Sequence, residues 1–215
     1  MYYSYWSGMP TGGEFQAYLR PTRALVAIPT HDDLTCVVVG WPIDEFDSNR
    51  HDVENNYLKA FDAEPAFAER MRHATRVERL VGTTMAGFYR TPYGPGWALV
   101  GDAGYHKDPL TAQGIGDAFR DAELLAGAID EGVRGHRPLD DALADYERRR
   151  DEAALPLYDF THELAGLEPP APDMQALFGA LRHDPGQTSR FFGVIAGTVP
   201  MAEFFARDDV AAGVA

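Results

Sequence analysis

The alternation of apolar and polar residues divides the chain into an extended first part and a largely helical last part. Four stretches near the start are rich in aromatic or β-branched residues, and turn-forming residues separate them. These stretches cover residues 2–7, 14–20, 23–28 and 34–41. Their spacing predicts an antiparallel meander of four strands with one aromatic, partly open face.

Beyond Asp47 the apolar residues recur with a helical period. The apolar face of a first helix is formed by Val53, Tyr57, Leu58 and Phe61. Pro65 then begins a second short helix that runs through Met71. Further extended segments are expected at residues 76–81, 87–90 and 97–100.

The remaining elements are helical, and together with the strands they predict an α+β fold. One helix is expected from Asp117 to about Val133, and Pro138 begins another. A stiff, Pro-rich linker covers residues 168–172. Two shorter helices, at 173–182 and 187–197, and an acidic, Ala-rich tail follow.

The helix that Pro138 begins has an apolar side and a basic side. Leu143 and Tyr146 are expected to point inward, with Leu155 as a further candidate. The consecutive residues Arg148, Arg149 and Arg150 are expected to form a solvated face. Pro156 should kink or restart this helix, because proline lacks the backbone N–H group.

Residues 101–116 are the most distinctive stretch, because they join the apolar strand at 97–100 to a helix. The order strand, Gly-rich loop, helix places the Asp102 carboxylate at a strand end and small residues at a helix N-terminus. The backbone N–H groups there are unpaired and the helix dipole is positive, so the site suits an electron-rich ligand group. Taken alone, Gly101-Asp102-Ala103 is equally compatible with a plain turn that Asp102 caps.

Composition narrows the choice of partners and compartment. The formal net charge of −14 argues against nucleic acid and anionic membrane as partners. The single cysteine, Cys36, lies in an apolar run typical of a buried strand and cannot form a disulfide within the chain, which fits a cytoplasmic location. Seven scattered histidines lack metal-ligand spacing, so no metal site is predicted, and His106 is interpreted as a polar residue of the loop.

The spacing over residues 99–125 is more specific than the turn alone. Its elements are Leu99-Val100-Gly101-Asp102-Ala103, Pro109, Gly114-Ile115 and Asp121-Ala122-x-x-Leu125. This pattern resembles the second FAD-binding motif of the class A flavoprotein monooxygenases, the aromatic-hydroxylase-like group. The preceding segment, which ends in Ala27-Ile28-Pro29-Thr30, is similar to the substrate-domain sheet of that group.

The resemblance implies an FAD site in the loop. Asp102 would accept hydrogen bonds from ribityl hydroxyls, Pro109 would fix the loop beside the isoalloxazine ring, and backbone N–H groups from Gly114 onward would face flavin N1 and O2. The implied cofactor-binding residues are Gly101, Asp102, Ala103, Pro109, Gln113, Gly114, Ile115 and Gly116. Two departures stand out, since family members often carry Gly in place of Thr111 and Asn or Ser in place of Gly116.

The resemblance also implies that the fold is incomplete. Residues 1–96 would be a substrate-domain-like sheet with two short helices, 97–166 the C-terminal part of an FAD-binding domain, and 167–215 a helical extension. The Gly-x-Gly-x-x-Gly strand and helix that bind the ADP part of FAD have no counterpart in this sequence. Apolar faces on the strand at 97–100 and on the helix of Ile115 would then be exposed, unless a missing N-terminal half or a homo-oligomer covers them.

The implied activity is that of an FAD-dependent monooxygenase. NAD(P)H would reduce FAD, and a flavin hydroperoxide would oxygenate a small organic substrate such as an aromatic one. No side chain is identified as catalytic; Tyr3, Tyr5 and Trp6 are weak candidates for a substrate surface, beside the alternative of ordinary sheet packing.

Two alternatives stay open. One is a related flavin reductase or a halogenase, which would need a lysine on a tunnel from the flavin, and the chain has only Lys59 and Lys107. The other is a non-catalytic fragment, or a subunit that needs a separate FAD-binding half.

Overall fold

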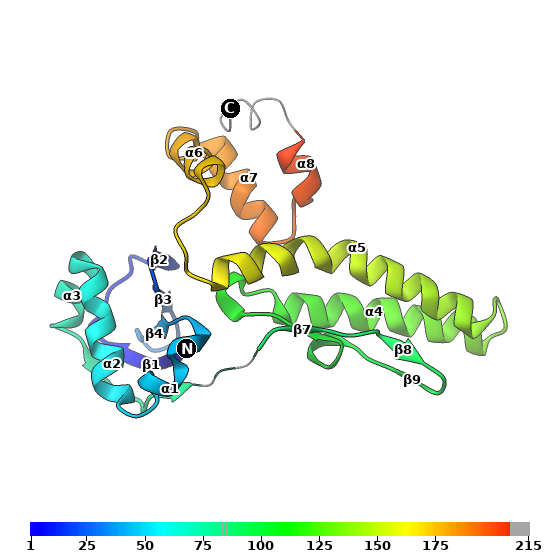
Figure 1. Ribbon diagram of the computed structural model, residues 1–215, viewed down its shortest axis with the longest axis horizontal. Coiled ribbons are helices and arrows are strands. Elements are labelled where there is room, and N and C mark those ends of the chain that lie inside the picture. The colour runs from blue at the N-terminus through cyan, green and yellow to red at the C-terminus, as the bar shows by residue number, and fades with distance from the viewer. Residues whose placement is uncertain (83, 85, 207–215) are drawn as a thin grey trace. The chain divides into compact units, whose positions relative to one another are not determined.

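The computed structural model describes residues 1–82, 84 and 86–206. The chain divides into two compact units, Met1–Met85 with Ala165–Pro169 and Ala86–Leu164 with Pro170–Ala215. The predicted α+β class is confirmed, because an antiparallel sheet forms the first unit and long helices form most of the second (Figure 1). The boundary expected at residue 96 falls inside the second unit.

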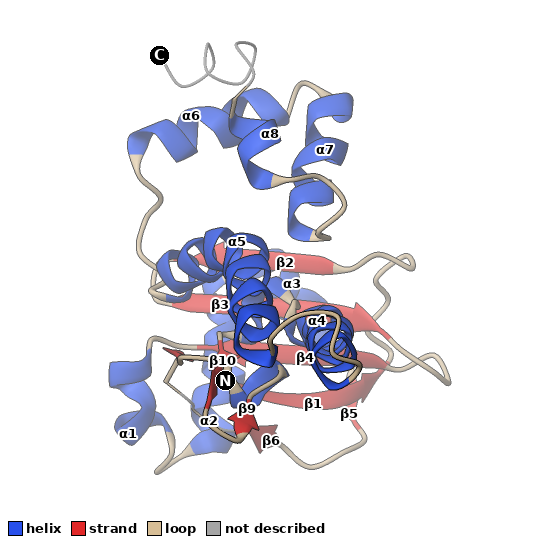
Figure 2. Ribbon diagram, turned by 90° about the vertical axis from the view of Figure 1, so that its right-hand side faces the viewer, coloured by secondary structure: helices blue, strands red, loops and turns tan. Residues whose placement is uncertain are grey.

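The first unit is built around one six-stranded sheet (Figure 2). Its strands are β1 (Tyr2–Ser7), β2 (Gln16–Arg20), β3 (Arg23–Pro29), β4 (Thr35–Gly40), β5 (Thr75–Arg76) and β6 (Val81–Gly82). Their order is β2-β3-β4-β1-β5, with β6 also paired to β1. The four predicted strands are present, but the predicted segment at 76–81 is two short strands.

The expected meander is wrong in one connection, since β1 lies beside β4 and not beside β2. Strands β2, β3 and β4 are joined by short turns and pair in sequence, whereas Tyr2 of β1 pairs with Val39 and Trp6 pairs with Thr35. Residues 8–15 are too many for a tight hairpin, and they connect β1 to the far edge of the sheet. The result is a Greek-key order, in which β1 has antiparallel neighbours on both sides.

Short helices supply the other half of this unit's core. They are α1 (Phe46–Asn49), α2 (Val53–Ala60) and α3 (Pro65–Met71), and a 3₁₀ turn at Phe61–Ala63 follows α2. Tyr57, Phe61 and Phe67 pack against Trp6 and Val37 of the sheet. Of the predicted α2 face, Leu58 is instead exposed, because the buried stripe follows Tyr57, Ala60 and Phe61.

The second unit contains four short strands and two long helices. The strands are β7 (Phe88–Tyr89), β8 (Tyr93–Gly94), β9 (Trp97–Ala98) and β10 (Tyr105–His106), which pair as β10 with β7 and β8 with β9. The strands predicted at 87–90 and 97–100 are therefore shorter than expected. Each has a single neighbour among the described residues, and a strand pair alone gives little support to a longer ladder.

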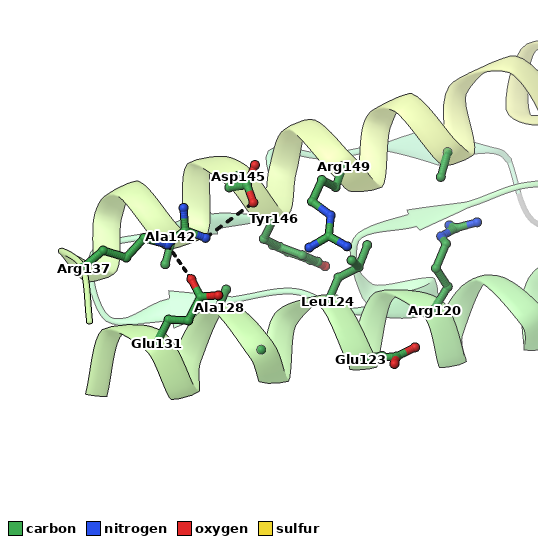
Figure 3. Close-up of a pocket in the computed structure, with 12 residues that line it drawn as sticks. Arg120, Glu123, Leu124, Ala128, Glu131, Arg137, Ala142, Asp145, Tyr146 and Arg149 are labelled. Carbon is green, nitrogen blue, oxygen red and sulfur yellow. Dashed lines mark hydrogen bonds and ion pairs between the residues drawn. The ribbon is translucent and has the colours of Figure 1, made fainter. Parts of the chain in front are cut away.

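Helices α4 (Gly114–Val133) and α5 (Leu139–Ala165) lie side by side and run antiparallel (Figures 1 and 3). The residues buried between them are Ala128, Ala142, Leu143 and Tyr146, as predicted for the last two. Helix α4 begins at Gly114, earlier than its predicted start at Asp117, so the Gly-rich segment is itself the first helical turn.

The prediction that α5 exposes its whole arginine run is wrong at one position. Arg150 points inward and is only 1% exposed, because its guanidinium packs over the rings of Tyr89 and Tyr105. The helix also continues through Pro156 without a break. The carbonyl that Pro156 leaves without a partner is that of Glu152, which lies on the exposed side of α5, where water can bond it.

Three shorter helices complete the unit, namely α6 (Pro172–Leu181), α7 (Pro185–Ile195) and α8 (Met201–Phe205). The first two confirm the predicted pair, whereas α8 lies where a tail was expected. Leu177, Val194 and Phe204 form their common core. The end of the expected tail, residues 207–215, lies outside the described residues.

Candidate functional site

The loop that follows β9 packs directly on the start of α4. Gly101 opens a 3₁₀ turn, Gly101–Ala103, with a φ of +56°, and a Cβ atom there would lie 3.0 Å from the Cβ of Ala118. Only glycine tolerates both this backbone conformation and this approach. The carboxylate of Asp108 then caps a second 3₁₀ turn, Pro109–Thr111, by accepting a hydrogen bond from the N–H of Leu110 at 3.0 Å.

A cavity of about 350 Å³ lies between this loop and α4. Five of the predicted cofactor-binding residues line it, namely Gly101, Asp102, Pro109, Gly114 and Ile115. The predicted residues Ala103, Gln113 and Gly116 are not among its lining. The Gln113 side chain instead donates hydrogen bonds to the carbonyls of Thr111 and Ile195.

The cavity wall carries one positive helix end and one free carboxylate. The N–H group of Asp117 bonds the carbonyl of Gln113 at 3.0 Å, so the N–H groups of Gly114 to Gly116 precede the first helical hydrogen bond. Asp102 is exposed, and its carboxylate has no hydrogen-bond or ion-pair partner among the described residues. Its Oδ1 would lie 3.9 Å from a Cβ atom placed on Gly114, at the start of α4. Asp102 therefore does not act as a cap in this structure.

A chain of charged side chains begins at the cavity wall, where Lys107 and Asp117 are buried. The Nζ of Lys107 is 2.7 Å from Oδ2 of Asp117, and Nη1 of Arg120 is 2.8 Å from Oδ1 of the same carboxylate. Arg120 also donates to the Tyr105 hydroxyl at 2.7 Å and to Oδ1 of Asp121 at 2.9 Å. Burial raises the pKa of Asp121, although hydrogen bonds from Arg120 oppose the shift, and burial also raises the pKa of Tyr105.

The spacing of charged residues along α4 is a signal for this network. Asp117, Asp121, Leu124 and Ala128 follow the helical spacing of a single face of α4. Ala128 is the member of this face that packs against α5, so the two aspartates face inward as well. Charged residues at the inward positions of an amphipathic helix require buried partners of opposite charge.

His106 also belongs to the cavity wall. Its ring stacks on Phe88, with centroids 6.0 Å apart, and its buried Nδ1 atom has no hydrogen-bond partner among the described residues. The structure therefore places this residue beside the cavity, with a ring nitrogen that no described residue contacts by a hydrogen bond.

The three candidate substrate residues in β1 do not share one surface. Successive residues of a strand point to opposite faces. Tyr3 and Tyr5 lie together, with ring centroids 6.3 Å apart and half-buried side chains. Trp6 points into the core, where its Nε1–H donates to the Tyr57 hydroxyl at 3.1 Å. Grouping Trp6 with the two tyrosines is therefore wrong.

A larger hollow of about 520 Å³ lies between α4 and α5 (Figure 3). Arg137 bridges Glu131 and Asp145 at one end of it, and Tyr146 forms part of its wall. The Tyr146 hydroxyl already has a hydrogen-bond partner, since it donates to the carbonyl of Leu99 at 2.7 Å. This hollow carries none of the motif residues, so the loop cavity is the better candidate site.

The surface of α4 that faces away from α5 is apolar and exposed. Its members follow the spacing of a helix-pairing stripe, Ile115, Phe119, Ala122, Ala126, Ile129 and Val133. Ile115, Phe119 and Val133 are 77%, 74% and 78% exposed. Trp97 and Val100, near the loop, are exposed as well. The predicted apolar faces at the strand and on the helix of Ile115 are thus confirmed.

The described residues contain neither a metal-ligand group nor a membrane-spanning helix. No group of three or more potential metal ligands lies together within residues 1–82, 84 and 86–206. Over the same residues, no helix is long and apolar enough to cross a membrane.

Comparison with known proteins shows a shared fold and one local sequence match. No family model matches the sequence. A tryptophan 2-halogenase of Chondromyces crocatus is 32% identical over 98 residues, which are 45% of this chain and 19% of that protein. The match is therefore local.

The structural matches cover more of the chain. PqsL of P. aeruginosa, solved with 2-aminobenzoylacetate, gives a TM-score of 0.62 at 24% identity over 76% of this chain and 46% of its own. The flavin-dependent brominase Bmp2 gives 0.76 at 17% identity over 91% and 49%. The myxobacterial chondrochloren halogenase CndH gives 0.65 at 20% identity over 99% and 53%.

The chain therefore has the fold of the flavin-dependent monooxygenases and halogenases. The resemblance to the class A flavoprotein group is confirmed at the level of the fold. The chain spans about half the length of these solved structures.

Proposed function

We propose that this chain is part of an FAD-dependent oxidoreductase of the monooxygenase and halogenase group, and that residues 101–116 bind the flavin end of FAD. One observation carries the proposal: five residues of the predicted motif line one cavity, at the N-terminus of a 20-residue helix. The fold of the neighbouring structures supports it independently, because those proteins are flavin-dependent enzymes.

The residues present fit the flavin and its ribityl chain. The Asp102 carboxylate has no partner among residues 1–82, 84 and 86–206, and a polyol offers the hydroxyl donors that it lacks. The N–H groups of Gly114 to Gly116, at the positive end of α4, suit the electron-rich edge of the ring. Pro109 gives the cavity wall a rigid backbone. The bound flavin would supply the redox and oxygen chemistry, and these residues would hold and orient it.

We propose a small organic substrate and NAD(P)H as reductant. PqsL was solved with 2-aminobenzoylacetate, which is an aromatic compound, and it has the same fold. Within the first unit, Tyr3 and Tyr5 offer half-buried aromatic surface outside the core. An aromatic substrate would stack on such rings. The described loop residues supply no clear catalytic acid or base, so the chain's contribution is to hold and position the reactants.

The direct test is flavin titration with an Asp102 variant. Asp102→Ala should weaken FAD binding by about 1–3 kcal/mol, the scale of a hydrogen bond to a charged group. Asp130→Ala is the matched control, because Asp130 is an exposed aspartate of α4 that pairs with Arg134. Equal FAD affinity of the Asp102 variant and the wild type would refute the assignment.

A halogenase is the second candidate, favoured by the match to a tryptophan 2-halogenase. Of the two lysines, Lys107 is the one at the loop cavity, but its ammonium is paired to Asp117. Assays of a flavin-loaded assembly with tryptophan, with and without chloride or bromide, separate the two activities. A halogenated product would establish the halogenase, and a halide-independent hydroxylated product the monooxygenase.

We also propose that the remainder of the flavoprotein fold covers the α4 stripe. The chain spans about half the length of the solved neighbours, and the stripe is exposed along the whole of α4. Glu123 and Asp130 lie on one flank of the stripe, so an antiparallel second copy would bring these carboxylates together, whereas a covering segment with basic flanks would not. Phe119→Glu should abolish binding of an added FAD-binding half. Loss of a dimer of this chain in the same variant would favour the homo-oligomer instead. A complex that forms unchanged with this variant would refute the assignment.

A further inference from the structure

Lys107 and Asp117 face each other across the base of the flavin loop. We propose that this buried ion pair is a positioning device, which holds residues 108–113 against α4 so that the cavity is formed before any ligand binds. The ligand's identity rests on the proposed function, whereas the positioning role rests on the geometry of the chain itself.

The pair closes the loop at both ends. Lys107 directly precedes the loop, as the residue after β10, and Asp117 lies in the first turn of α4. Their charged atoms are 2.7 Å apart, and their side chains are 5% and 6% exposed. The loop of residues 108–113 and the first residues of α4 therefore lie between two ends that this one contact holds together.

A second contact two residues earlier acts in the same direction. Tyr105 and Lys107 alternate with His106 along the extended segment, so both point toward α4. The Tyr105 hydroxyl accepts a hydrogen bond from Arg120, which also binds Asp117. Asp117 is thus held by Lys107 and Arg120 together, and the segment from Tyr105 to Lys107 is attached to α4 at two points.

General stability does not require charges at this place. Two well-packed apolar side chains would fill the same space without the desolvation that a buried ion pair pays. The ammonium lies 2.7 Å from one carboxylate oxygen but outside hydrogen-bond geometry, so the contact is a close charge–charge attraction. It differs from an apolar contact because it requires one particular partner of opposite charge at this place. Such a contact fixes the register of the loop on the helix, which a packed pair of methyl groups would leave less defined.

The loop already holds two hydrogen bonds that report its order. The N–H of Leu110 donates to Asp108, and the N–H of Ala112 donates to the carbonyl of Pro109 at 2.9 Å. Amide hydrogen exchange of these two residues therefore measures loop order directly in the full chain, without flavin.

The experiment compares exchange in the wild type with exchange in Lys107→Met and in Asp117→Asn. Both variants should exchange the Leu110 and Ala112 amides at least about tenfold faster than the wild type, which corresponds to about 1.4 kcal/mol of local opening. Lys59→Met is the matched control, because Lys59 is the other lysine and is exposed on α2. It should leave both amides unchanged.

Two further variants separate positioning from a loss of overall stability. Leu143→Ala removes a buried side chain between α4 and α5, away from the loop, and should lower thermal stability without selectively exposing the loop amides. The double variant Lys107→Met/Asp117→Leu should regain thermal stability but not the loop protection. The proposal is overturned if loop exchange in the two single variants matches that of the wild type. It is also overturned if their loop exchange only follows the loss of thermal stability, as in Leu143→Ala, or if the double variant restores the loop protection.

A flavin titration of the same proteins tests the ligand separately. Lys107→Met should weaken FAD binding in step with the loss of loop protection, while Lys59→Met should not. Wild-type protein that fails to bind FAD but shows the exchange pattern above would reject the proposed function and leave the positioning role standing.

Discussion

Arg150 offers the sharpest test of the packing in the second unit. Its guanidinium donates from Nε to Asp151 at 2.8 Å and from both Nη atoms to the carbonyl of Arg90 at 3.2 Å. The same group lies 4.7 Å from the ring centroid of Tyr89 and 5.8 Å from that of Tyr105. Arg150→Ala would remove all of these contacts from a site that water does not reach.

The size of the effect follows from burial. Arg150→Ala leaves the Arg90 carbonyl without its buried partner, whereas Asp151 is 31% exposed and can be hydrated, so the expected cost is about 1–3 kcal/mol. The separate contributions of the hydrogen bonds and the ring contacts are not additive, so they do not increase this figure. Arg150→Lys should recover little of the loss, since an ammonium cannot both stack on a ring and donate from a planar fork.

The neighbouring arginines provide matched controls on the same helix. Arg148 is exposed and pairs with Glu152 at 2.9 Å, and Arg149 is exposed as well. Alanine at either position should cost about 1 kcal/mol or less, the range of surface pairs. Urea unfolding followed by far-ultraviolet circular dichroism measures all three variants. An Arg150→Ala variant as stable as Arg148→Ala would refute the buried role.

Three further outcomes are expected. Tyr57→Phe should cost about 1–3 kcal/mol in urea unfolding, because it leaves the Trp6 Nε1–H and the Val37 carbonyl without their buried partner. Burial raises the pKa of Cys36, so its thiol should resist alkylation at mildly alkaline pH in the folded chain and react once the chain is unfolded in denaturant. Burial also raises the pKa of Asp121, so the folded chain binds the carboxyl proton more tightly than the unfolded chain. The resulting stability is present at low pH and is lost as the pH rises from about 4 through the raised pKa. Asp121→Asn should abolish that slope in urea unfolding curves measured across the acid range, and an unchanged slope would contradict the assignment.

Local patterns predicted an element well where the apolar residues that define its pattern also form its buried face. The strands at 23–28 and 34–41 and the helix from Pro65 to Met71 were predicted because their apolar residues face one core. The pairing of β1 with β4 was not predictable from turn lengths alone, because the connection at residues 8–15 permits either neighbour. Sequence order favours adjacent strands, whereas the sheet gains most when the aromatic β1 has neighbours on both sides.

The same distinction applies to the candidate site: residues defined by local spacing were predictable, and contacts made only in the folded chain were not. Gly101, Asp102, Pro109, Gly114 and Ile115 were predicted by motif spacing, and the structure brings them to one cavity. The charges behind the cavity were missed, because a charged residue is ordinarily interpreted as solvated. Only the three-dimensional structure shows that Arg150, at the end of an arginine run, meets two tyrosine rings.

Helix α4 has two faces with different requirements, and this difference predicts how the chain alone should bind flavins. The partners of its inward face, Asp117 and Asp121, lie within the second unit, so the loop cavity that we propose to bind the flavin is formed by that unit alone. No Gly-x-Gly-x-x-Gly strand and helix for the ADP part of FAD is present in the sequence. The chain should therefore bind riboflavin and FAD with affinities within about a factor of ten, which is about 1.4 kcal/mol. Fluorescence titration of both ligands measures the ratio, and a far tighter affinity for FAD would show that the chain contacts the ADP part as well.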